Sequence, residues 1–447
     1  MTKTMKADVV VIGGGVLGCF VTRALRRFEL QTLLLEAEAD VCMGISRANS
    51  AIVYAGYDHT SESLKGRLTV ASNVTFDDLC AQLAVPFKRC GGMMVCHGPK
   101  GKAVLEKKYM QGQALHVPDL QLLDEKAAHQ LEPALSEKVV AALYAPSVGT
   151  VNPWQLTVAA YENALANGAE AMLGTSVTAI RCEAQGYVVN ANDVCISCRA
   201  VINCAGLSAD RVHEWCFPPS ARLRLDGADY LVMAQAAENP SHVLFQEQEE
   251  GGKGVTAVPT VEGTLLLASP ARPLEAEPWA TSRANLIHLR QMANTVLPHL
   301  KDQQLLRSFA AVRPNPYDAT GCKRRIRDFS IVEAAPGFIS LLGIKTPGLT
   351  CANALARQIA ERMACELKAA PNRHYDPRRP MPQINDDEII CQCHQISKAA
   401  VLSAIKRGAN SLAGVKHRLG TGMGPCQGGR CQNRIEQLIE EHGNGIL

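Results

Sequence analysis

The sequence has no long apolar segment, few aromatic residues and almost no excess charge. No apolar run approaches the roughly 20 residues that cross a bilayer, and Met1-Thr2-Lys3 leads into a strand pattern without a signal peptide. Aromatic residues make up 5% of the chain and the formal net charge is +3, so no basic surface with interleaved aromatic residues is predicted. We therefore expect a soluble cytoplasmic protein that is not membrane-spanning and has no nucleic-acid partner.

Cysteine, in contrast, is abundant, at 17 residues. In the reducing cytoplasm most of these side chains stay as thiols. Cys80, Cys182, Cys204 and Cys365 stand among apolar neighbours. We expect scattered cysteines of this kind to fill the core.

Four cysteines near the C-terminus form a different pattern, Cys391-Gln-Cys393 followed by Cys426-Gln-Gly-Gly-Arg-Cys431. Four thiolates hold either a [2Fe-2S] cluster or a structural zinc ion. Zinc ribbons usually present each pair with two intervening residues, whereas these pairs have one and four. The spacing favours a cluster held by all four cysteines.

The surroundings of the second pair fit a cluster. Glycines in 420–424 and at 428–429 let the backbone wrap closely around sulfur and direct N–H groups toward it. Helices are predicted from 399 to 406, capped by Ser397, and from 433 to 441. Residues 388–447 resemble the bacterioferritin-associated ferredoxin-like [2Fe-2S] domain, which has a similar Gly-Met-Gly-x-Cys-Gln-Gly-x-x-Cys segment.

At the N-terminus, an apolar strand at 8–12 leads into Gly13-Gly14-Gly15-Val16-Leu17-Gly18 and a helix predicted at 19–28. The first glycine makes the turn, the second lets the backbone approach a pyrophosphate, and the third lets helix and strand pack closely. Glu36, after a second strand, would accept hydrogen bonds from a ribose. Gly13, Gly15, Val16, Gly18 and Glu36 are therefore predicted to bind a dinucleotide.

The identity of this dinucleotide depends on the rest of the chain, because NAD and FAD sites share the fingerprint. No second Gly-x-Gly-x-x-Gly follows a strand, so a chain that binds both cofactors is not indicated and FAD is preferred. The apolar strand at 200–204 ends in Ala205-Gly206, whose turn is expected to approach the cofactor.

The chain is long enough for about three domains at about 150 residues each. A proline-rich and basic stretch separates the cluster segment from the rest, and we expect it to be a solvated tether. The predicted fold class is α/β, with a Rossmann-like FAD-binding domain interleaved with an α+β substrate domain and followed by a small helical [2Fe-2S] domain. The expected ranges are 1–80, 146–212 and 330–368 for the FAD-binding domain, 81–145 and 213–329 for the substrate domain, 369–387 for the linker and 388–447 for the cluster domain.

Residues 1–368 resemble the FAD-dependent D-amino-acid oxidase and glycerol-3-phosphate dehydrogenase superfamily. The resemblance rests on 9–18 with Glu36, on 44–50, on 201–210 and on 338–350. Segments 63–68 and 149–154 are similar to glycerol-3-phosphate dehydrogenase-like and L-2-hydroxyglutarate dehydrogenase-like proteins. The C-terminal segment resembles that of the anaerobic glycerol-3-phosphate dehydrogenase large subunit.

The resemblance implies further contacts to FAD. A helix that starts near Leu349 would direct its positive end toward the flavin and stabilise negative charge on it. Val177 would contact the adenine through its backbone. The implied contacts are Arg47, Ala48, Asn49, Ser50, Val177, Ala205, Gly206, Gly343, Lys345, Gly348, Leu349 and Thr350.

The resemblance also implies a substrate site. Arg313 would grip the substrate anion, and Lys345 would hold that anion or stabilise reduced flavin. Independently of the resemblance, the ordinary pKa of histidine, about 6.5, makes His59 the candidate general base. The family's His-Gly-Gly-x-Arg-Tyr or His-Ser-Gly-x-Arg-Tyr is replaced by residues 54–59, Tyr-Ala-Gly-Tyr-Asp-His. Asp58 would repel an anion if it faced the pocket.

The predicted function is a FAD-dependent dehydrogenase that oxidises a small anionic secondary alcohol, similar to glycerol 3-phosphate, to a ketone. Electrons would pass through the [2Fe-2S] cluster to a partner flavoprotein, a quinone system or a small electron carrier. The chain would then be a subunit of a hetero-oligomer, cytoplasmic or held at the inner membrane by a partner. The alternatives are an L-2-hydroxy acid dehydrogenase of the hydroxyglutarate type, an amine or opine-type dehydrogenase, and an electron-relay subunit of a complex.

Overall fold

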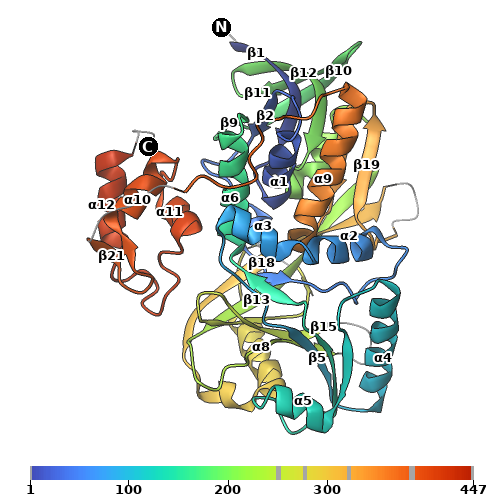
Figure 1. Ribbon diagram of the computed structural model, residues 1–447, viewed down its shortest axis with the longest axis vertical. Coiled ribbons are helices and arrows are strands. Elements are labelled where there is room, and N and C mark those ends of the chain that lie inside the picture. The colour runs from blue at the N-terminus through green and yellow to red at the C-terminus, as the bar shows by residue number, and fades with distance from the viewer. Residues whose placement is uncertain (1–2, 248–252, 275–278, 320–323, 382–387, 444–447) are drawn as a thin grey trace.

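Two β-sheets and a small helical domain make up the computed structural model, which describes residues 3–247, 253–274, 279–319, 324–381 and 388–443. The two sheets lie one above the other in Figure 1, and the C-terminal helices lie beside α6. The predicted α/β class and the small helical C-terminal domain are confirmed. No helix in the described part of the chain is both long enough and apolar enough to cross a membrane.

The first sheet has a parallel centre, in which β1 pairs with β2 on one side and β12 on the other. Val9, Val10 and Val11 are completely buried there, because helices or strands cover both faces of the sheet. The strands are β1 Lys3–Ile12, β2 Thr32–Leu35, β9 Glu170–Met172, β10 Val177–Glu183, β11 Gly186–Ala191, β12 Val194–Asn203, β19 Ser330–Ala335 and β20 Phe338–Leu342.

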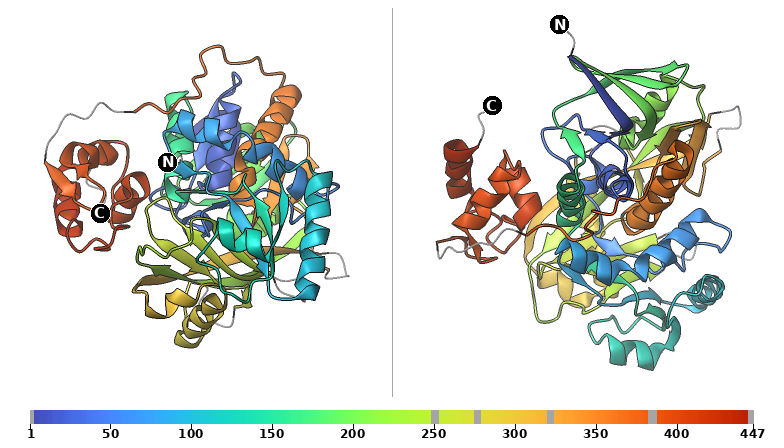
Figure 2. Two further views of the ribbon diagram at one scale, coloured as in Figure 1. Left: turned by 60° about the horizontal axis from the view of Figure 1, so that its bottom comes forward. Right: turned by 45° about the horizontal axis from the view of Figure 1, so that its top comes forward.

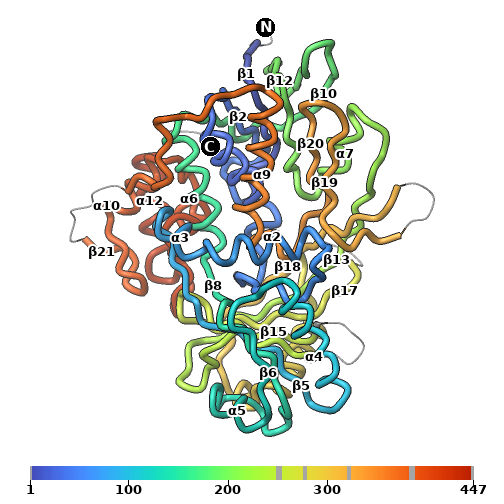
Figure 3. The backbone as a smooth tube through the Cα atoms, turned by 45° about the vertical axis from the view of Figure 1, so that its right-hand side comes forward, coloured from blue at the N-terminus to red at the C-terminus, as the bar shows by residue number. Residues whose placement is uncertain are grey.

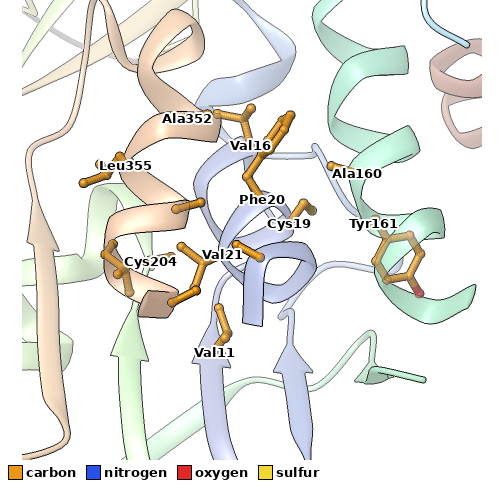
Figure 4. Close-up of a cluster of buried hydrophobic side chains, with 14 of the residues drawn as sticks. Val11, Val16, Cys19, Phe20, Val21, Ala160, Tyr161, Cys204, Ala352 and Leu355 are labelled. Atoms are coloured by element: carbon orange, nitrogen blue, oxygen red, sulfur yellow. The ribbon is translucent and has the colours of Figure 1, made fainter. Parts of the chain in front are cut away.

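Three helices pack over this sheet, with α1 (Val16–Leu25) between α6 (Pro153–Ala166) and α9 (Gly348–Leu367). Figure 4 shows Phe20 and Val21 of α1 pointing into the apolar core that these helices form above the strands. The first helix was predicted at 19–28. It begins three residues earlier because Gly15 is already its N-cap, and it ends at Leu25, after which residues 26–28 form a turn.

The second sheet is mostly antiparallel, and its longest pairing joins β13 to β18. Helices α4, α5 and α8 lie around it (Figure 1). Its strands are β5 Gly92–Cys96, β6 Gln121–Asp124, β7 Ala141–Ala145, β13 Ala221–Met233, β14 Val243–Glu247, β15 Lys253–Pro259, β16 Leu265–Ala268, β17 Arg272–Pro273 and β18 Leu305–Asp318.

Between the sheets, β3 Ile52–Val53, β4 Phe87–Lys88 and β8 Gly149–Val151 form a small third sheet. The strands of the two large sheets fall within the residue ranges expected for the FAD-binding and substrate domains, a division that stays a prediction. The remaining helices of this part are α2 Leu64–Asn73, α3 Phe76–Leu83, α4 Pro99–Ala114, α5 Glu125–Leu131, α7 Ala209–Glu214 and α8 Arg283–Val296, with short 3-10 turns η1 Ile45–Arg47, η2 Gly206–Ser208 and η3 Pro298–Asp302.

The C-terminal domain has its own apolar core, which includes Val401, Val415 and Leu438. The Ser397 hydroxyl accepts a hydrogen bond from the Ala400 N–H at 3.2 Å and caps α10, as the sequence predicted. The elements are β21 Ile389–Cys391, β22 Ile396–Ser397, α10 Lys398–Lys406, α11 Leu412–Leu419 and α12 Gln432–His442.

The linker is not a solvated tether, contrary to the sequence expectation. Residues 369–381 have no helix or strand, yet the Arg379 side chain is 6% exposed and pairs with Glu162 of α6 at 2.6 Å. The Asn163 side chain donates to the carbonyls of Asp376 and Arg378. The segment therefore follows the surface of the first domain (Figures 2 and 3), and residues 382–387 lie outside the described part.

The expectation for scattered cysteines is correct only in part. Cys80 and Cys204 are buried in the core. Cys182 and Cys365 are exposed, because they lie on the solvent side of β10 and of the last turn of α9 respectively.

Candidate functional site

A cavity of about 830 Å³ opens where the parallel strands of the first sheet end. β1, β2 and β12 run in the same direction, so the turns that follow Ile12, Leu35 and Asn203 meet at one edge. Ligands bind at this carboxyl edge in open α/β sheets. The volume lies in the upper part of the usual range for ligand cavities.

The glycine fingerprint shapes one wall of this cavity. Gly13 has φ +102°, and a Cβ there would lie 2.6 Å from the Cys204 carbonyl oxygen. Gly15 lines the cavity. A Cβ on Gly18 would lie 1.8 Å from the Gly13 carbonyl oxygen, so Gly18 brings α1 against the turn and does not itself face the cavity. This backbone surface, open at the N-terminus of α1, fits a pyrophosphate.

Glu36 lies beside the fingerprint and lines the same cavity. Its carboxylate accepts hydrogen bonds from the Gly14 N–H and, at 2.9 Å, from the Glu38 N–H. Burial raises its pKa, while these backbone donors oppose the change. The acid is therefore held at the position where the sequence predicted a contact to the ribose.

The loop at 45–50 forms another wall of the cavity, and hydrogen bonds of its own side chains hold its conformation. The Ser46 hydroxyl accepts a hydrogen bond from the Val16 N–H at 2.9 Å, which ties the loop to the start of α1. The Asn49 side chain donates to the Ser46 carbonyl and accepts from the Ala51 N–H, both at 2.8 Å. The Arg47 guanidinium lies 5.0 Å from the centre of the Trp279 ring.

Most of the predicted cofactor contacts surround this one cavity, although they come from six separate segments. The N-terminus of α9 enters it with Thr350, whose hydroxyl accepts from the Tyr54 N–H at 3.1 Å. The predicted residues that line the cavity are Gly13, Gly15, Val16, Glu36, Arg47, Ala48, Asn49, Ser50, Val177, Ala205, Gly206, Arg313, Lys345, Gly348, Leu349 and Thr350.

Two further predicted residues lie outside the cavity lining. Gly343 has φ +66°, and a Cβ there would lie 2.6 Å from the Pro316 ring, so this glycine allows a tight turn after β20. His59 is half-buried and is not among the residues that line the cavity. The structure therefore does not bring His59 to the substrate site.

Arg313 and Lys345 define a cationic end of the cavity. Both line it, and their hydrogen-bond partners are neutral groups: the Tyr230 hydroxyl for Arg313 and the Asn315 amide oxygen for Lys345. The Asn315 oxygen also accepts a hydrogen bond from Arg325 at 2.5 Å. Asp226 lies close enough to act on both cations, but Arg325 and Lys65 add further positive charge near Lys345, so the cavity wall can hold an anion.

The Lys345 amine can gain or lose its proton near neutral pH. Burial lowers its pKa to about 8, and the nearby Arg325 and Lys65 lower it in the same direction. An anion beside Lys345 would favour the protonated amine. Binding of an anionic substrate is therefore expected to raise the pKa of Lys345, and protonation of Lys345 is expected to strengthen substrate binding.

Asp58 does not oppose an anion in this cavity. Its carboxylate lies 2.6 Å from the Lys108 amine on α4, and it is not among the lining residues. The condition under which Asp58 would repel an anionic substrate is therefore not met, because its carboxylate pairs with Lys108 and does not line the cavity.

Several lining residues were not predicted, among them two aromatic residues from segments far from the fingerprint in the sequence. Tyr230 on β13 stacks on Phe309 of β18, with ring centres 4.6 Å apart, and its pKa is raised by burial. Tyr54 and Trp279 also line the cavity. The sequence around Tyr230 is a continuous mostly apolar run, Gly227-Ala-Asp-Tyr-Leu-Val-Met233, which does not tell which face of the strand meets the cofactor domain.

The four predicted cluster ligands lie in two close pairs. The Cys393 and Cys426 sulfur atoms are 3.5 Å apart, and the Cys391 and Cys431 thiols are hydrogen-bonded. Throughout the described chain, no three His, Cys, Asp or Glu side chains converge in the geometry that would hold one metal ion. Two pairs of thiols, each with one cysteine from the C-x-C segment and one from the C-x4-C segment, fit a centre that contains two irons.

Comparison with protein families gives two matches. The model described as FAD dependent oxidoreductase matches residues 8–362. The model described as BFD-like [2Fe-2S] binding domain matches residues 389–441. The predicted FAD and [2Fe-2S] cofactors are thus confirmed, and the donor sets described above fit both.

Individual relatives agree with these matches. A glycerol 3-phosphate dehydrogenase of Caloramator mitchellensis is 33% identical over 97% of this chain and 93% of its own length. A mitochondrial L-2-hydroxyglutarate dehydrogenase of Arabidopsis thaliana is 26% identical over 80% of this chain and 83% of its own. The structure of dithionite-reduced L-α-glycerophosphate oxidase from Mycoplasma pneumoniae with FAD bound has a TM-score of 0.77, 24% identity, and coverage of 85% of this chain and 100% of that chain.

Proposed function

Because the chain belongs to the FAD dependent oxidoreductase family and carries a BFD-like [2Fe-2S] binding domain, we propose that it is a glycerol 3-phosphate dehydrogenase. The substrate would be oxidised at its secondary alcohol to a ketone. The electrons would leave through the C-terminal domain to a partner flavoprotein, a quinone system or a small carrier.

The cationic end of the cavity carries this proposal. Arg313 presents a planar pair of donors that suits a phosphate, and Lys345 adds a second positive charge beside it. Asn315 fixes Lys345, and it is held in turn by Arg325. Two cations with neutral hydrogen-bond partners suit an anion with more than one negative charge.

The residues around the cavity would orient FAD and substrate toward each other. The fingerprint and Glu36 would hold the pyrophosphate and ribose, while residues 348–350 would direct the positive end of α9 at the flavin. When bound, FAD would supply the acceptor for a hydride from the substrate carbon, and the hydroxyl proton would be released to solvent. Arg313 and Lys345 would hold the anionic end of the substrate, so that its alcohol carbon faces the flavin. His59 lies outside the cavity and takes no part in this mechanism.

The four cysteines of the C-terminal domain would hold the second redox group. A [2Fe-2S] cluster exchanges one electron at a time, so it suits an acceptor that takes single electrons. The relative of similar length that is named glycerol 3-phosphate dehydrogenase supports the same assignment.

The test is anaerobic mixing of the purified holoenzyme with single substrates. Glycerol 3-phosphate is expected to bleach the flavin absorbance, and the reduced cluster should then appear by electron paramagnetic resonance. If glycerol 3-phosphate leaves the flavin oxidised, the proposed substrate is wrong.

L-2-hydroxyglutarate is a second candidate, favoured by the relative with that substrate in its name and by the ability of Arg313 to bind a carboxylate. The same experiment separates the two, because only the true substrate reduces the flavin at low concentration. Reduction by proline or sarcosine instead would support the amine-oxidising alternative, and reduction only by a protein partner would support an electron-relay subunit.

A further inference from the structure

The C-terminal domain contacts the first domain through a buried ionic cluster. Helix α11 packs on α6, and the Arg418 side chain of α11 is fully buried at this contact. It donates to the Asp40 carboxylate at 2.5 and 3.1 Å, and its Nε lies 3.4 Å from Glu162 Oε1. Asp40 and Glu162 are only 5% and 6% exposed.

Two more arginines complete this cluster. Arg379 of the linker and Arg407, next to α10, pair with Glu162 at 2.6 and 3.1 Å. A Cβ on Gly414 would lie 2.8 Å from the Asp40 carboxylate, so α11 approaches this closely because it carries glycine there. Separation of the domains would break all of these pairs at once while returning their charges to water, so the cluster specifies one docked position of the C-terminal domain more than it adds stability.

Asp40 lies within a segment that forms one wall of the FAD cavity, but it does not itself line the cavity, and its carboxylate pairs with Arg418. Residues 36–38 and 43–50 line the cavity on both sides of Asp40. Next to it, the Cys42 N–H donates to the carbonyl of Gly14 in the fingerprint at 2.9 Å. The segment 36–50 therefore contacts Arg418 on one side and lines the nucleotide site on the other.

A second contact reaches the same wall. The Trp154 indole N–H donates to the Arg47 carbonyl at 2.7 Å, and Arg47 lines the cavity. On its other side Trp154 stacks on His417 of α11, with ring centres 5.3 Å apart. Besides the contacts with α6, α11 thus reaches the segment 36–50 in two ways, directly through Asp40 and indirectly through Trp154.

We propose that docking of the C-terminal domain and binding of FAD are thermodynamically coupled through the segment 36–50, with Arg418 and Asp40 as the positioning pair. FAD orders this segment from inside and α11 orders it from outside, so each event favours the other. Coupling of this kind is reciprocal. The [2Fe-2S] domain is then a fixed part of the FAD enzyme and not a mobile carrier.

The test uses the full chain and two readouts that do not depend on turnover. The first is hydrogen exchange in α11 with and without FAD, followed by mass spectrometry. The second is the rate of FAD release from the diluted holoenzyme, followed by the fluorescence of free flavin. In the wild-type protein FAD is expected to slow exchange in α11.

The Asp40→Asn variant keeps the shape of the side chain and an acceptor for the Val41 N–H, but it removes the charge that holds Arg418. We expect FAD to leave this variant roughly tenfold faster, in the lower part of the usual range for coupled sites, and its α11 to lose the protection that FAD gives. Arg418→Met should behave in the same way. Arg434→Met is the matched control, because Arg434 lies in α12 and is 36% exposed.

The cluster absorbance shows whether the C-terminal domain of each variant is folded. If Arg418→Met loses that absorbance, Asp40→Asn decides the result, because it leaves the sequence of the C-terminal domain intact. Wild-type FAD release in a folded Asp40→Asn variant would overturn the proposal. Equal exchange in α11 with and without FAD in the wild-type protein would overturn it as well. Neither result depends on which substrate the enzyme oxidises.

Discussion

At the scale of single residues, the two cations of the cavity decide what can bind. Arg313 and Lys345 both face the cavity, and neutral partners hold both of them. A hydrogen bond to a charged group contributes about 1.5–3 kcal/mol, which corresponds to roughly 10- to 100-fold in an equilibrium constant. Loss of either cation should therefore affect substrate binding more than cofactor binding.

Arg313→Met is expected to lower kcat/KM for the anionic substrate roughly 10- to 100-fold, because the bidentate contact to the anion is lost. Arg313→Lys should recover part of this loss, since a point charge replaces the planar fork. Steady-state kinetics with the purified variants measures both effects. A kcat/KM unchanged in Arg313→Met would remove Arg313 from the substrate site.

The substrate KM is expected to rise as the pH rises through about 8. Burial lowers the pKa of Lys345 to that value, so the amine is mostly charged at pH 7 and mostly neutral at pH 9. The neutral amine no longer attracts the anion. A pH profile of KM checks this, and the Lys345→Met variant should have a high KM that no longer changes in this range.

At the scale of elements, the contact of α1 with the turn after β1 sets the shape of the pyrophosphate site. Gly18 lies against the Gly13 carbonyl with no space for a side chain. Helix and strand therefore approach more closely than any other residue would allow. The N-terminus of α1 thereby stays at the edge of the cavity.

Gly18→Ala is expected to destabilise the protein by about 1–3 kcal/mol, the usual cost of overpacking, and to release FAD. The added Cβ would lie 1.8 Å from a backbone oxygen, so α1 has to move outward. Thermal unfolding and the flavin content after gel filtration measure these effects. Unchanged thermal unfolding together with full flavin retention in Gly18→Ala would contradict the argument.

At the scale of the whole molecule, the two redox groups belong to parts with separate cores. The C-terminal core is formed within residues 390–439, and the cluster ligands Cys391 and Cys431 belong to it. The FAD cavity is formed by residues before 351. Loss of the cluster should therefore leave substrate oxidation at the flavin possible.

Cys426→Ser is expected to remove the iron-sulfur absorbance and to stop electron transfer to a one-electron acceptor. Flavin bleaching by substrate under anaerobic conditions should persist, because Cys426 lies far from the cavity lining in the sequence and is not part of it. Absorbance spectra before and after substrate addition test both points. A variant whose flavin no longer bleaches would show that the two halves of the reaction depend on each other.

The sequence by itself determined the local features of this protein. The fingerprint at 13–18, the acid at 36 and the four cysteines each depend on short spacings, because a turn, a helix start or a thiolate pair is built from neighbouring residues. Ser397 as the cap of α10 is another such feature. The choice of FAD needed the whole sequence, because it rested on the absence of a second fingerprint.

The tertiary structure alone decided which distant residues meet. It placed Tyr230 beside Arg313, paired Asp58 with Lys108 and left His59 outside the cavity. It also turned the basic linker into a packed segment and buried Arg418 between Asp40 and Glu162. Contacts of this kind depend on strand register and on how domains pack, and neither is encoded in the spacing of neighbouring residues.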